Sequence, residues 1–240
     1  MAHKELIWEI INNLQNNNLI QVEEHNKKYV KKIGHGVLMG KINKMLNENY
    51  SPKIIPNAYG IEGLWYITNY LTPDELNNVK EKIDNGDIKL EPISKKFKSR
   101  RVAHYGYYYS YDRTGLKTAP SIPDYLDRLA SVDKINNLVG EKIINDTKFD
   151  QVIINEYEPG QQIAYHTDHI KLFGPIVACI TVGQAVPINF KLGNTIKTIN
   201  VEEGSMYIMT CDARYKWQHS LKNNLNENRY SITYRTVNKN

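Results

Sequence analysis

The sequence predicts a mixed α/β fold of the α+β type, in which helices precede and flank a β-sandwich or barrel. After Asp146 the chain holds seven or eight short segments rich in β-branched and aromatic residues. Turns containing Gly, Asn, Pro or Asp separate these segments, which is typical of consecutive strands. Upstream, apolar residues recur at helical spacing in several polar stretches. Many short strands in succession favour two packed sheets or a closed barrel, with the helices covering it from outside.

The first part of the chain, residues 1–57, is expected to form a helical N-terminal extension of unknown role. Apolar residues follow helical spacing in two stretches of it, LIWEIINNL and LMGKINKML. Two prolines and a glycine in the following SPKIIPNAYG indicate a linker or an extended arm. We therefore expect two domains, the extension and a larger domain over residues 58–240.

A strand and a helix open the larger domain. The segment GLWYITNYL alternates aromatic and β-branched residues with polar ones and predicts a strand. In TPDELNNVKEKI, which follows, Thr72 can cap a helix, Pro73 suits the first helical position and Glu75 completes a capping box. This helix is expected to end near Asn85 and Gly86. A further helix is predicted over PSIPDYLDRLASVDKINNLV.

A cationic and aromatic patch covers residues 95–113, KKFKSRRVAHYGYYYSYDR. Its basic side chains can contact phosphates, and its rings can stack on exposed bases. The alternative is a half-buried strand whose tyrosines pack on the core and whose basic flank is solvated. The candidate substrate contacts in this patch are Arg100, Arg101, Tyr105, Tyr107 and Tyr109.

Composition limits the cellular setting more than the function. The 240 residues carry a formal net charge of +5, which favours a nucleic-acid partner only slightly. The chain has no run of 18 apolar residues and no signal-peptide pattern, so we expect no membrane association and an intracellular place, cytoplasmic or nuclear, not secreted. Two separated cysteines, Cys179 and Cys211, provide neither a disulfide framework nor a zinc knuckle.

Two histidines and one carboxylate form the candidate metal site. His166 and Asp168 are two residues apart in a predicted strand end, so they share a face, and His219 follows about fifty residues later. Such a set can hold Fe(II) on one side and leave up to three positions open, as in non-haem oxygenases. A structural zinc, which would want a fourth protein ligand, and a satisfied core histidine are the alternatives.

The last predicted strand, RYSITYR, points two guanidiniums to one side. Arg229, Ser231 and Arg235 alternate with apolar and aromatic residues. Buried arginines require anions, and a cosubstrate with two carboxylates would supply them. The alternative is a pair of exposed arginines on an edge strand. By the same alternation, Asn155 and Tyr157 share a face in QVIINEY.

Taken together, these motifs resemble the AlkB family of Fe(II)- and 2-oxoglutarate-dependent dioxygenases, over roughly residues 60–237. The resemblance implies a double-stranded β-helix (jelly-roll) core and a reaction that consumes 2-oxoglutarate and dioxygen. It implies the iron ligands His166, Asp168 and His219. It also implies a 2-oxoglutarate pocket with Arg229 on the distal carboxylate, Arg235 near the metal-bound end, and Asn155, Tyr157 and Ser231 along its wall.

The resemblance further implies a nucleic-acid substrate, tRNA or DNA, whose base is unpaired or flipped. Repair members carry an acidic residue where this chain has Ile170, which argues against a cationic methylated base. RRVAHYGYYYSYD and ARYKWQHS look most like the AlkB domain of the eukaryotic tRNA wobble-uridine hydroxylase. The expected reaction on the base is oxidative demethylation or stable hydroxylation.

The competing hypotheses are a protein or lipid oxygenase and a catalytically silent nucleic-acid-binding module. No protein partner is indicated.

Overall fold

The computed structural model describes residues 20–22, 29–31, 50–94, 99–110, 115–145 and 148–238. The chain divides into two compact units, Met1–Ser51 and Pro52–Asn240. In the first unit, β1 (Ile20–Val22) and β2 (Tyr29–Lys31) form an antiparallel pair. The helices expected within residues 1–57 lie outside the described residues. The domain boundary near residue 57 stays a prediction, and the expected linker contributes a strand to the sheet of the second unit.

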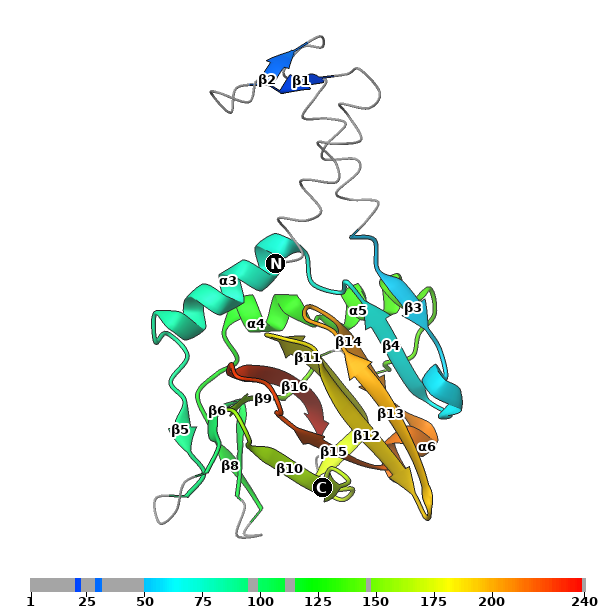
Figure 1. Cartoon of the computed structure of the whole chain (residues 1–240). Helices are drawn as coiled ribbons and strands as arrows, with labels where there is room; N and C mark the ends of the chain where they lie inside the picture. Colours follow the sequence, from blue (N-terminus) through cyan, green and yellow to red (C-terminus); the bar gives the residue numbers. More distant parts are fainter. Residues whose placement is uncertain are drawn as a thin grey trace. The chain divides into compact units, whose positions relative to one another are not determined.

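Two antiparallel sheets form the centre of the second unit (Figure 1). The larger sheet has the order β3 (Lys53–Ile55), β4 (Leu64–Thr68), β14 (Met206–Met209), β11 (Phe173–Val182), β16 (Arg229–Val237), β9 (Gln151–Tyr157), β6 (Arg101–Tyr105) and β5 (Glu91–Pro92). The smaller sheet has the order β10 (Gln162–His166), β15 (Gln218–Lys222), β12 (Val186–Leu192) and β13 (Thr195–Val201). A separate hairpin joins β7 (Tyr107–Tyr109) to β8 (Leu116–Thr118).

From β9 onward the chain passes back and forth between the two sheets. Strands β9, β11, β14 and β16 belong to the larger sheet, and β10, β12, β13 and β15 to the smaller one. This is the strand order of a jelly roll, which closes two four-stranded halves around one interior. The predicted α+β fold with a jelly-roll core is therefore confirmed.

The larger sheet separates two hydrophobic cores. On one side it packs against α3 (Pro73–Asp84), α4 (Asp124–Leu129) and α5 (Val132–Val139), which lie together along that face (Figure 1). On the other side it faces the smaller sheet across a second cluster that includes Tyr157, Val177 and Phe190. Because side chains alternate along a strand, β9 sends Val152 and Ile154 to the helices and its odd-numbered neighbours to the interior.

The helices begin and end largely where their capping residues indicate. In α3 the Thr72 hydroxyl accepts from the amide of Glu75 at 3.2 Å, and the Glu75 carboxylate accepts from the Thr72 amide at 2.9 Å. This capping box and the strand β4 confirm the sequence predictions. The single helix predicted over residues 120–139 is instead two helices. Ser131 separates them because its hydroxyl caps α5, accepting from the amide of Lys134 at 3.2 Å.

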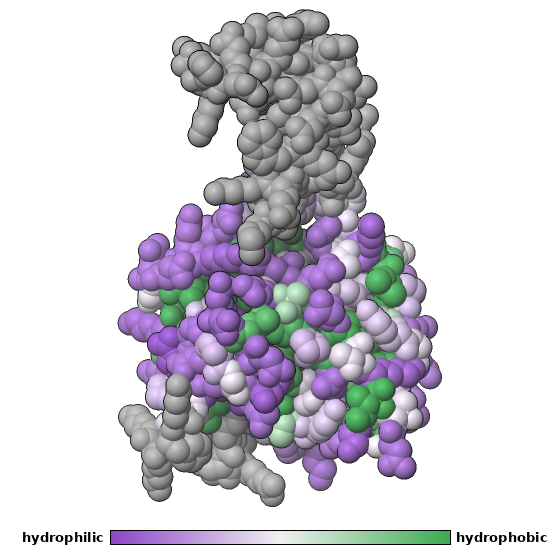
Figure 2. Space-filling view, in the orientation of Figure 1, coloured by the Kyte–Doolittle hydropathy of each residue, from purple (hydrophilic) through white to green (hydrophobic). Residues whose placement is uncertain are grey.

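Within the described ranges, no helix has both the length and the apolar character needed to cross a membrane. On the face shown in Figure 2, hydrophilic residues surround separate hydrophobic patches.

Gly106 connects β6 to β7 and needs to be glycine for two reasons. Its φ is +72°, in the left-handed region, and a Cβ added there would lie 1.9 Å from the carbonyl oxygen of Asp150. Its amide donates to Pro120 O at 2.7 Å, and its carbonyl accepts from the Ala119 amide at 3.0 Å. The turn therefore presses directly on the backbone that precedes β9.

We expect Gly106→Ala to lower the free energy of unfolding by at least about 3 kcal/mol, because backbone strain and a backbone clash combine. Gly86→Ala is the matched control, since Gly86 has φ +75° with nothing within 4 Å of an added Cβ. It should cost only about 1–2 kcal/mol for the left-handed conformation. Urea unfolding of both variants measures the difference, and equal losses would show that the close approach at Gly106 is unimportant.

Candidate metal centre and anion pocket

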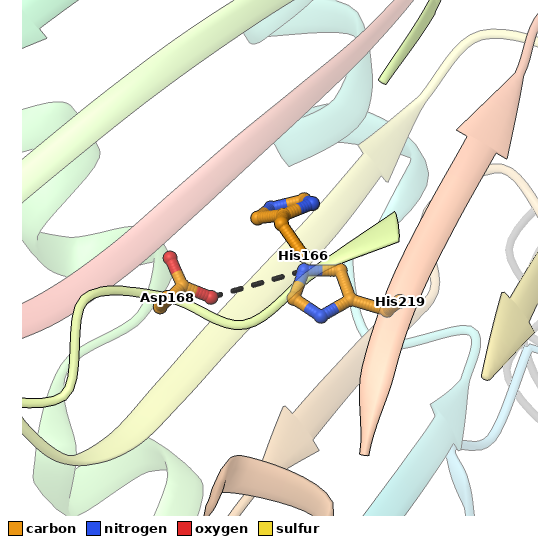
Figure 3. A group of neighbouring side chains, drawn as sticks. All are labelled: His166, Asp168 and His219. Carbon is orange, nitrogen blue, oxygen red and sulfur yellow. Dashed lines mark ion pairs between the residues drawn. The ribbon is translucent and has the colours of Figure 1, made fainter. Parts of the chain in front are cut away.

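Two strands of the smaller sheet and the loop after one of them bring His166, Asp168 and His219 together. His166 ends β10 and lies opposite His219 of β15, and a register shift after Ile163 breaks the regular pairing there. Asp168 follows in the connection to β11. One ligand atom from each of the three residues lies within 4.8 Å of the others. Figure 3 shows the Asp168 carboxylate turned toward His219, with His166 next to them.

A hydrogen bond and burial indicate which nitrogen of each histidine could bind a metal. The Nδ1 of His166 lies 2.9 Å from the carbonyl oxygen of Ala164, which can only accept, so Nδ1 carries a proton and Nε2 is the ring nitrogen that could bind a metal. Burial, and then the neighbouring His166, lowers the pKa of His219 to about 3, so this imidazole is neutral at physiological pH. Both rings can therefore donate a nitrogen lone pair to a metal ion.

Asp168 presents one satisfied and one unsatisfied oxygen. Its Oδ1 accepts from Arg235 Nε at 2.6 Å and also pairs with Arg235 Nη2. Its Oδ2 is buried without a hydrogen-bond partner in the described parts of the chain and lies 3.8 Å from His219 Nε2. Burial alone would raise the pKa of this carboxyl, but the surrounding Arg235, His219, His166 and Arg214 together outweigh burial and lower the pKa. A buried, charged oxygen beside two imidazoles fits a cation.

The larger sheet contributes a buried guanidinium, that of Arg229 in β16. The register of β9 and β16 sets Arg229 opposite Tyr157 and Ser231 opposite Asn155. All four line one cavity of about 130 Å³ together with the three candidate metal ligands. Arg229 is 1% exposed, and its Nη2 donates to Thr181 Oγ1 at 3.1 Å.

Arg229 lacks an acidic partner among the residues that the structure describes, and its Nε is buried without an acceptor. An uncompensated buried cation is costly, so this end of the cavity suits an anion. Two phenols complete its wall, Tyr157 and Tyr207. Burial raises the pKa of both phenols, which keeps them protonated and able to donate.

Sequence reasoning did not single out Tyr207 or Thr181. Both belong to strands, SMYIMT and IVACITVG, that have the composition of ordinary buried strands. Only their pairing with neighbours in the larger sheet brings them beside Arg229. The sequence feature that could have indicated them is a side chain with a hydroxyl, Thr181 or Tyr207, inside an otherwise apolar strand.

Arg235 contacts the candidate metal ligand rather than the far end of the pocket. In addition to Asp168, it donates from Nη1 to Gln151 Oε1 at 3.1 Å, and its guanidinium lies over the Phe173 ring at 4.9 Å. Arg229 and Arg235 thus face the same cavity from two ends of β16, as their alternation predicts.

The candidate substrate contacts are divided between different surfaces. Arg100 and Tyr109 line the cavity, where Arg100 Nε donates to Asn155 Oδ1 at 3.2 Å and the Tyr109 ring lies 5.7 Å from that of Phe173. Tyr105 packs against the helix-side core, and Tyr107 is half-buried in β7. Residues 95–98 and 111–113 of the patch lie outside the described residues.

Arg101 points away from the cavity. Its Nε and Nη2 donate to the two carboxylate oxygens of Glu156 at 2.5 and 2.7 Å. Glu156 also accepts from Asn228 Nδ2 at 3.1 Å and from the Tyr230 hydroxyl at 3.2 Å. Glu156 lies between Asn155 and Tyr157 in β9, so alternation sends it to the opposite face. The structure therefore does not bring Arg101 to the other site residues.

A jelly roll whose sheets enclose a His–Asp–His cluster beside a buried arginine is the arrangement of a metal-dependent oxygenase. The chain belongs to the 2OG-Fe(II) oxygenase superfamily, whose family model matches residues 63–235. Enzymes of this family use Fe(II), 2-oxoglutarate and dioxygen, and His166, Asp168 and His219 could bind the metal. The protein is thus an oxidoreductase, as the sequence predicts.

Several curated relatives resemble the chain. Protein L905 of Acanthamoeba polyphaga mimivirus is 31% identical over 197 residues, covering 75% of this chain and 87% of that protein. The tRNA (carboxymethyluridine(34)-5-O)-methyltransferase alkbh8 of Xenopus tropicalis is 28% identical, over 74% of this chain and 27% of its own length. For the Mus musculus ALKBH8 the values are 27%, 83% and 31%. The chain thus spans under a third of these two methyltransferases.

Solved structures share the fold. OsALKBH1 superposes with a TM-score of 0.57 at 14% identity, covering 72% of this chain and 96% of that one. A Pseudomonas putida prolyl-4-hydroxylase gives 0.53 at 11% identity, with 74% and 94% covered. These likenesses support the jelly-roll core, and together with the ALKBH8 relatives they confirm the predicted resemblance to the AlkB family.

We expect Arg101→Ala to reduce stability rather than alter the cavity. The fully buried Glu156 carboxylate would lose its charged partner, at a cost of about 2 kcal/mol, limited because the Arg101 side chain is 46% exposed and water can replace it. Urea unfolding of Arg101→Ala, Glu156→Gln and the double variant measures the coupling. An unchanged stability combined with a large loss of nucleic-acid affinity would instead make Arg101 a substrate contact.

Proposed function

We propose that the protein is an Fe(II)- and 2-oxoglutarate-dependent dioxygenase that oxidises modified or alkylated nucleobases in nucleic acid, in RNA such as tRNA or in DNA. The observation that supports the iron and cosubstrate assignment is one cavity with two unmet charges. Asp168 Oδ2 lacks a hydrogen-bond partner at one end, and Arg229 lacks an acidic partner in the described residues at the other. A metal ion and a dicarboxylate together would satisfy both.

In this proposal Nε2 of His166, Nε2 of His219 and Oδ2 of Asp168 hold Fe(II). Bound Fe(II) and 2-oxoglutarate supply oxidising power: dioxygen is consumed as 2-oxoglutarate becomes succinate and carbon dioxide, and one oxygen atom enters a substrate C–H bond. The protein orients these groups. Arg235 fixes Asp168 Oδ1 at 2.6 Å and so directs Oδ2 toward the histidines.

The cosubstrate's distal carboxylate would bind Arg229. Thr181 already holds one nitrogen of this guanidinium, and the protonated hydroxyls of Tyr157 and Tyr207 can donate to the same carboxylate. Asn155 and Ser231 form the wall between this end and the metal, with Asn155 Nδ2 and Ser231 Oγ 3.5 Å apart. Arg235 is proposed to lie near the end of 2-oxoglutarate that binds the metal.

The substrate would enter past Arg100 and Tyr109, which line the cavity beside the metal centre. A guanidinium and an aromatic ring suit a nucleotide, through its phosphate and its base. The names of the ALKBH8 relatives make tRNA the first substrate to test. The oxidised carbon decides the product: a hydroxylated N-methyl group is lost as formaldehyde, whereas a hydroxylated side-chain carbon keeps its oxygen.

The direct test incubates the iron-loaded protein with 2-oxoglutarate and either total tRNA or methylated DNA oligonucleotides. Succinate is measured, and digested nucleosides are compared by mass spectrometry. A base that gains one oxygen or loses a methyl group supports the proposal. Turnover of a protein or lipid substrate in preference to all nucleic acids would contradict it, as would tight nucleic-acid binding without metal or 2-oxoglutarate binding.

We expect His166→Ala to abolish turnover and to weaken Mn(II) binding by at least about 100-fold, while the fold persists. The reason is that the metal would lose Nε2 of this residue as a ligand. The fold should persist because the His166 side chain belongs to neither hydrophobic core. Metal titration and thermal unfolding check both halves. Retained metal-dependent turnover in this variant would overturn the ligand assignment. His169→Ala, one residue beyond Asp168, serves as the neighbouring-histidine control for metal binding.

We expect Arg229→Met to raise the KM for 2-oxoglutarate about 10- to 100-fold, because a charge-assisted contact of about 1.5–3 kcal/mol is removed. Without cosubstrate, the same variant should be at least as stable as the natural protein, since a buried cation with no acidic partner among the described residues is replaced by an apolar side chain. Steady-state kinetics and urea unfolding measure the two effects. An unchanged KM would remove Arg229 from the pocket.

A further inference from the structure

We propose that Arg214 is a positioning residue that holds the main chain of the metal-binding loop in place. Arg214 lies in the short helix α6 (Cys211–Tyr215) and is 1% exposed. Its Nη1 donates to the carbonyl of Asp168 at 3.0 Å, its Nε to that of Gly174 at 3.1 Å and its Nη2 to that of Phe173 at 3.2 Å. One side chain thus joins both ends of the segment 168–174. This inference rests on the proposed role of Asp168 as a metal ligand.

The contacts of Arg214 are unusual for a buried cation. All its hydrogen bonds within the described residues go to main-chain carbonyls, and none goes to a carboxylate. Burial lowers the pKa of this guanidinium, although the nearby Asp168 opposes that shift. A long apolar side chain would fill the same space without this cost, but it could not join three carbonyls. The guanidinium fork therefore serves the geometry of the loop.

The end of this segment needs donors from outside the ladder, because β11 pairs irregularly there. The pairing of β11 with β16 shifts register between Phe173 and Val177, so Gly174 has no partner in β16. Gly174 is pressed against β16, where an added Cβ would lie 2.1 Å from Thr236 Oγ1. Asn238 Nδ2 gives Phe173 O a second donor at 3.3 Å. Arg214 supplies a donor to Phe173 O and a donor to Gly174 O.

Asp168 is consequently held at two points by two different arginines. Arg214 holds its carbonyl from α6, and Arg235 holds its carboxylate from β16. The guanidinium of Arg235 also lies 4.9 Å above the ring of Phe173, whose carbonyl binds Arg214. Arg214 therefore sets where the backbone of Asp168 lies, and Arg235 sets how its carboxylate turns. Without Arg214, the unpaired Oδ2 would not stay fixed opposite the two histidines.

The test compares Arg214→Lys with Ala213→Gly in the full-length protein. Lysine keeps the positive charge but loses the fork that reaches three carbonyls. Ala213, fully buried in the same helix, tests simple loosening of α6, since glycine weakens the helix and leaves Arg214 in place. Mn(II) alone is titrated under anaerobic conditions. We expect Arg214→Lys to raise the Mn(II) dissociation constant about 10- to 100-fold, and Ala213→Gly to change it less than about twofold.

A second readout needs no metal. The amides of Leu172 and Phe173 donate to His169 O at 3.3 and 3.0 Å, so their hydrogen exchange reports the order of the loop. In metal-free Arg214→Lys both should exchange faster, while amides in the centre of β11 keep their rates. Unchanged exchange together with unchanged Mn(II) affinity would overturn the proposal, and so would equal loss of affinity in Ala213→Gly.

Different results would show that the proposed metal site, rather than the role of Arg214, is wrong. If His166→Ala bound Mn(II) as well as the natural protein, the metal assignment would fall, whatever Arg214 does. Faster exchange confined to Leu172 and Phe173 in Arg214→Lys would still show that Arg214 orders the loop. Arg214→Met provides a further variant: if it folds, it should lose more Mn(II) affinity than the lysine variant, and equal affinity in the two would contradict a role for the donated hydrogen bonds.

Discussion

Burial of charge inside the jelly roll is the constraint on which the rest of the site depends. Asp168, Arg214 and Arg229 are all at most 6% exposed, in a region where isolated charges are costly. Each is stabilised differently: Asp168 by Arg235, Arg214 by main-chain carbonyls, and Arg229 by one hydroxyl. Of these three side chains, Arg229 and one oxygen of Asp168 have a buried polar atom without a partner in the described parts of the chain. These two positions are where the proposed cosubstrate and metal would bind.

The two sheets position different parts of the site. The smaller sheet and its adjoining loop carry the candidate metal ligands, and the larger sheet carries the anion pocket. The larger sheet can do this because helices cover its other face with an independent apolar core. Rigid strands place side chains more accurately than loops do. Asp168 is the exception, since it lies on a loop, and Arg214 and Arg235 both contact it there.

Much of the site could be predicted because strand alternation is local. The spacing of His166 and Asp168 and the alternation along RYSITYR place their side chains on shared faces. The roles of these residues came from family resemblance rather than geometry. Alternation also separates Arg100 from Arg101, which basic composition alone had grouped together. The role of Arg214 could not be predicted, because its partners are main-chain carbonyls 40 to 46 residues away in the sequence. Similarly, sheet order alone places Tyr207 beside Arg229.

The central claim is that one cavity holds a metal ion and a dicarboxylate together, each satisfying a group that the protein leaves unsatisfied. Anaerobic calorimetry of 2-oxoglutarate binding, with and without Mn(II), tests it most directly. If the two ligands share the cavity, Mn(II) should tighten 2-oxoglutarate binding, and 2-oxoglutarate should tighten Mn(II) binding by the same factor. Equal 2-oxoglutarate affinity with and without the metal, or no binding in either case, would contradict this account.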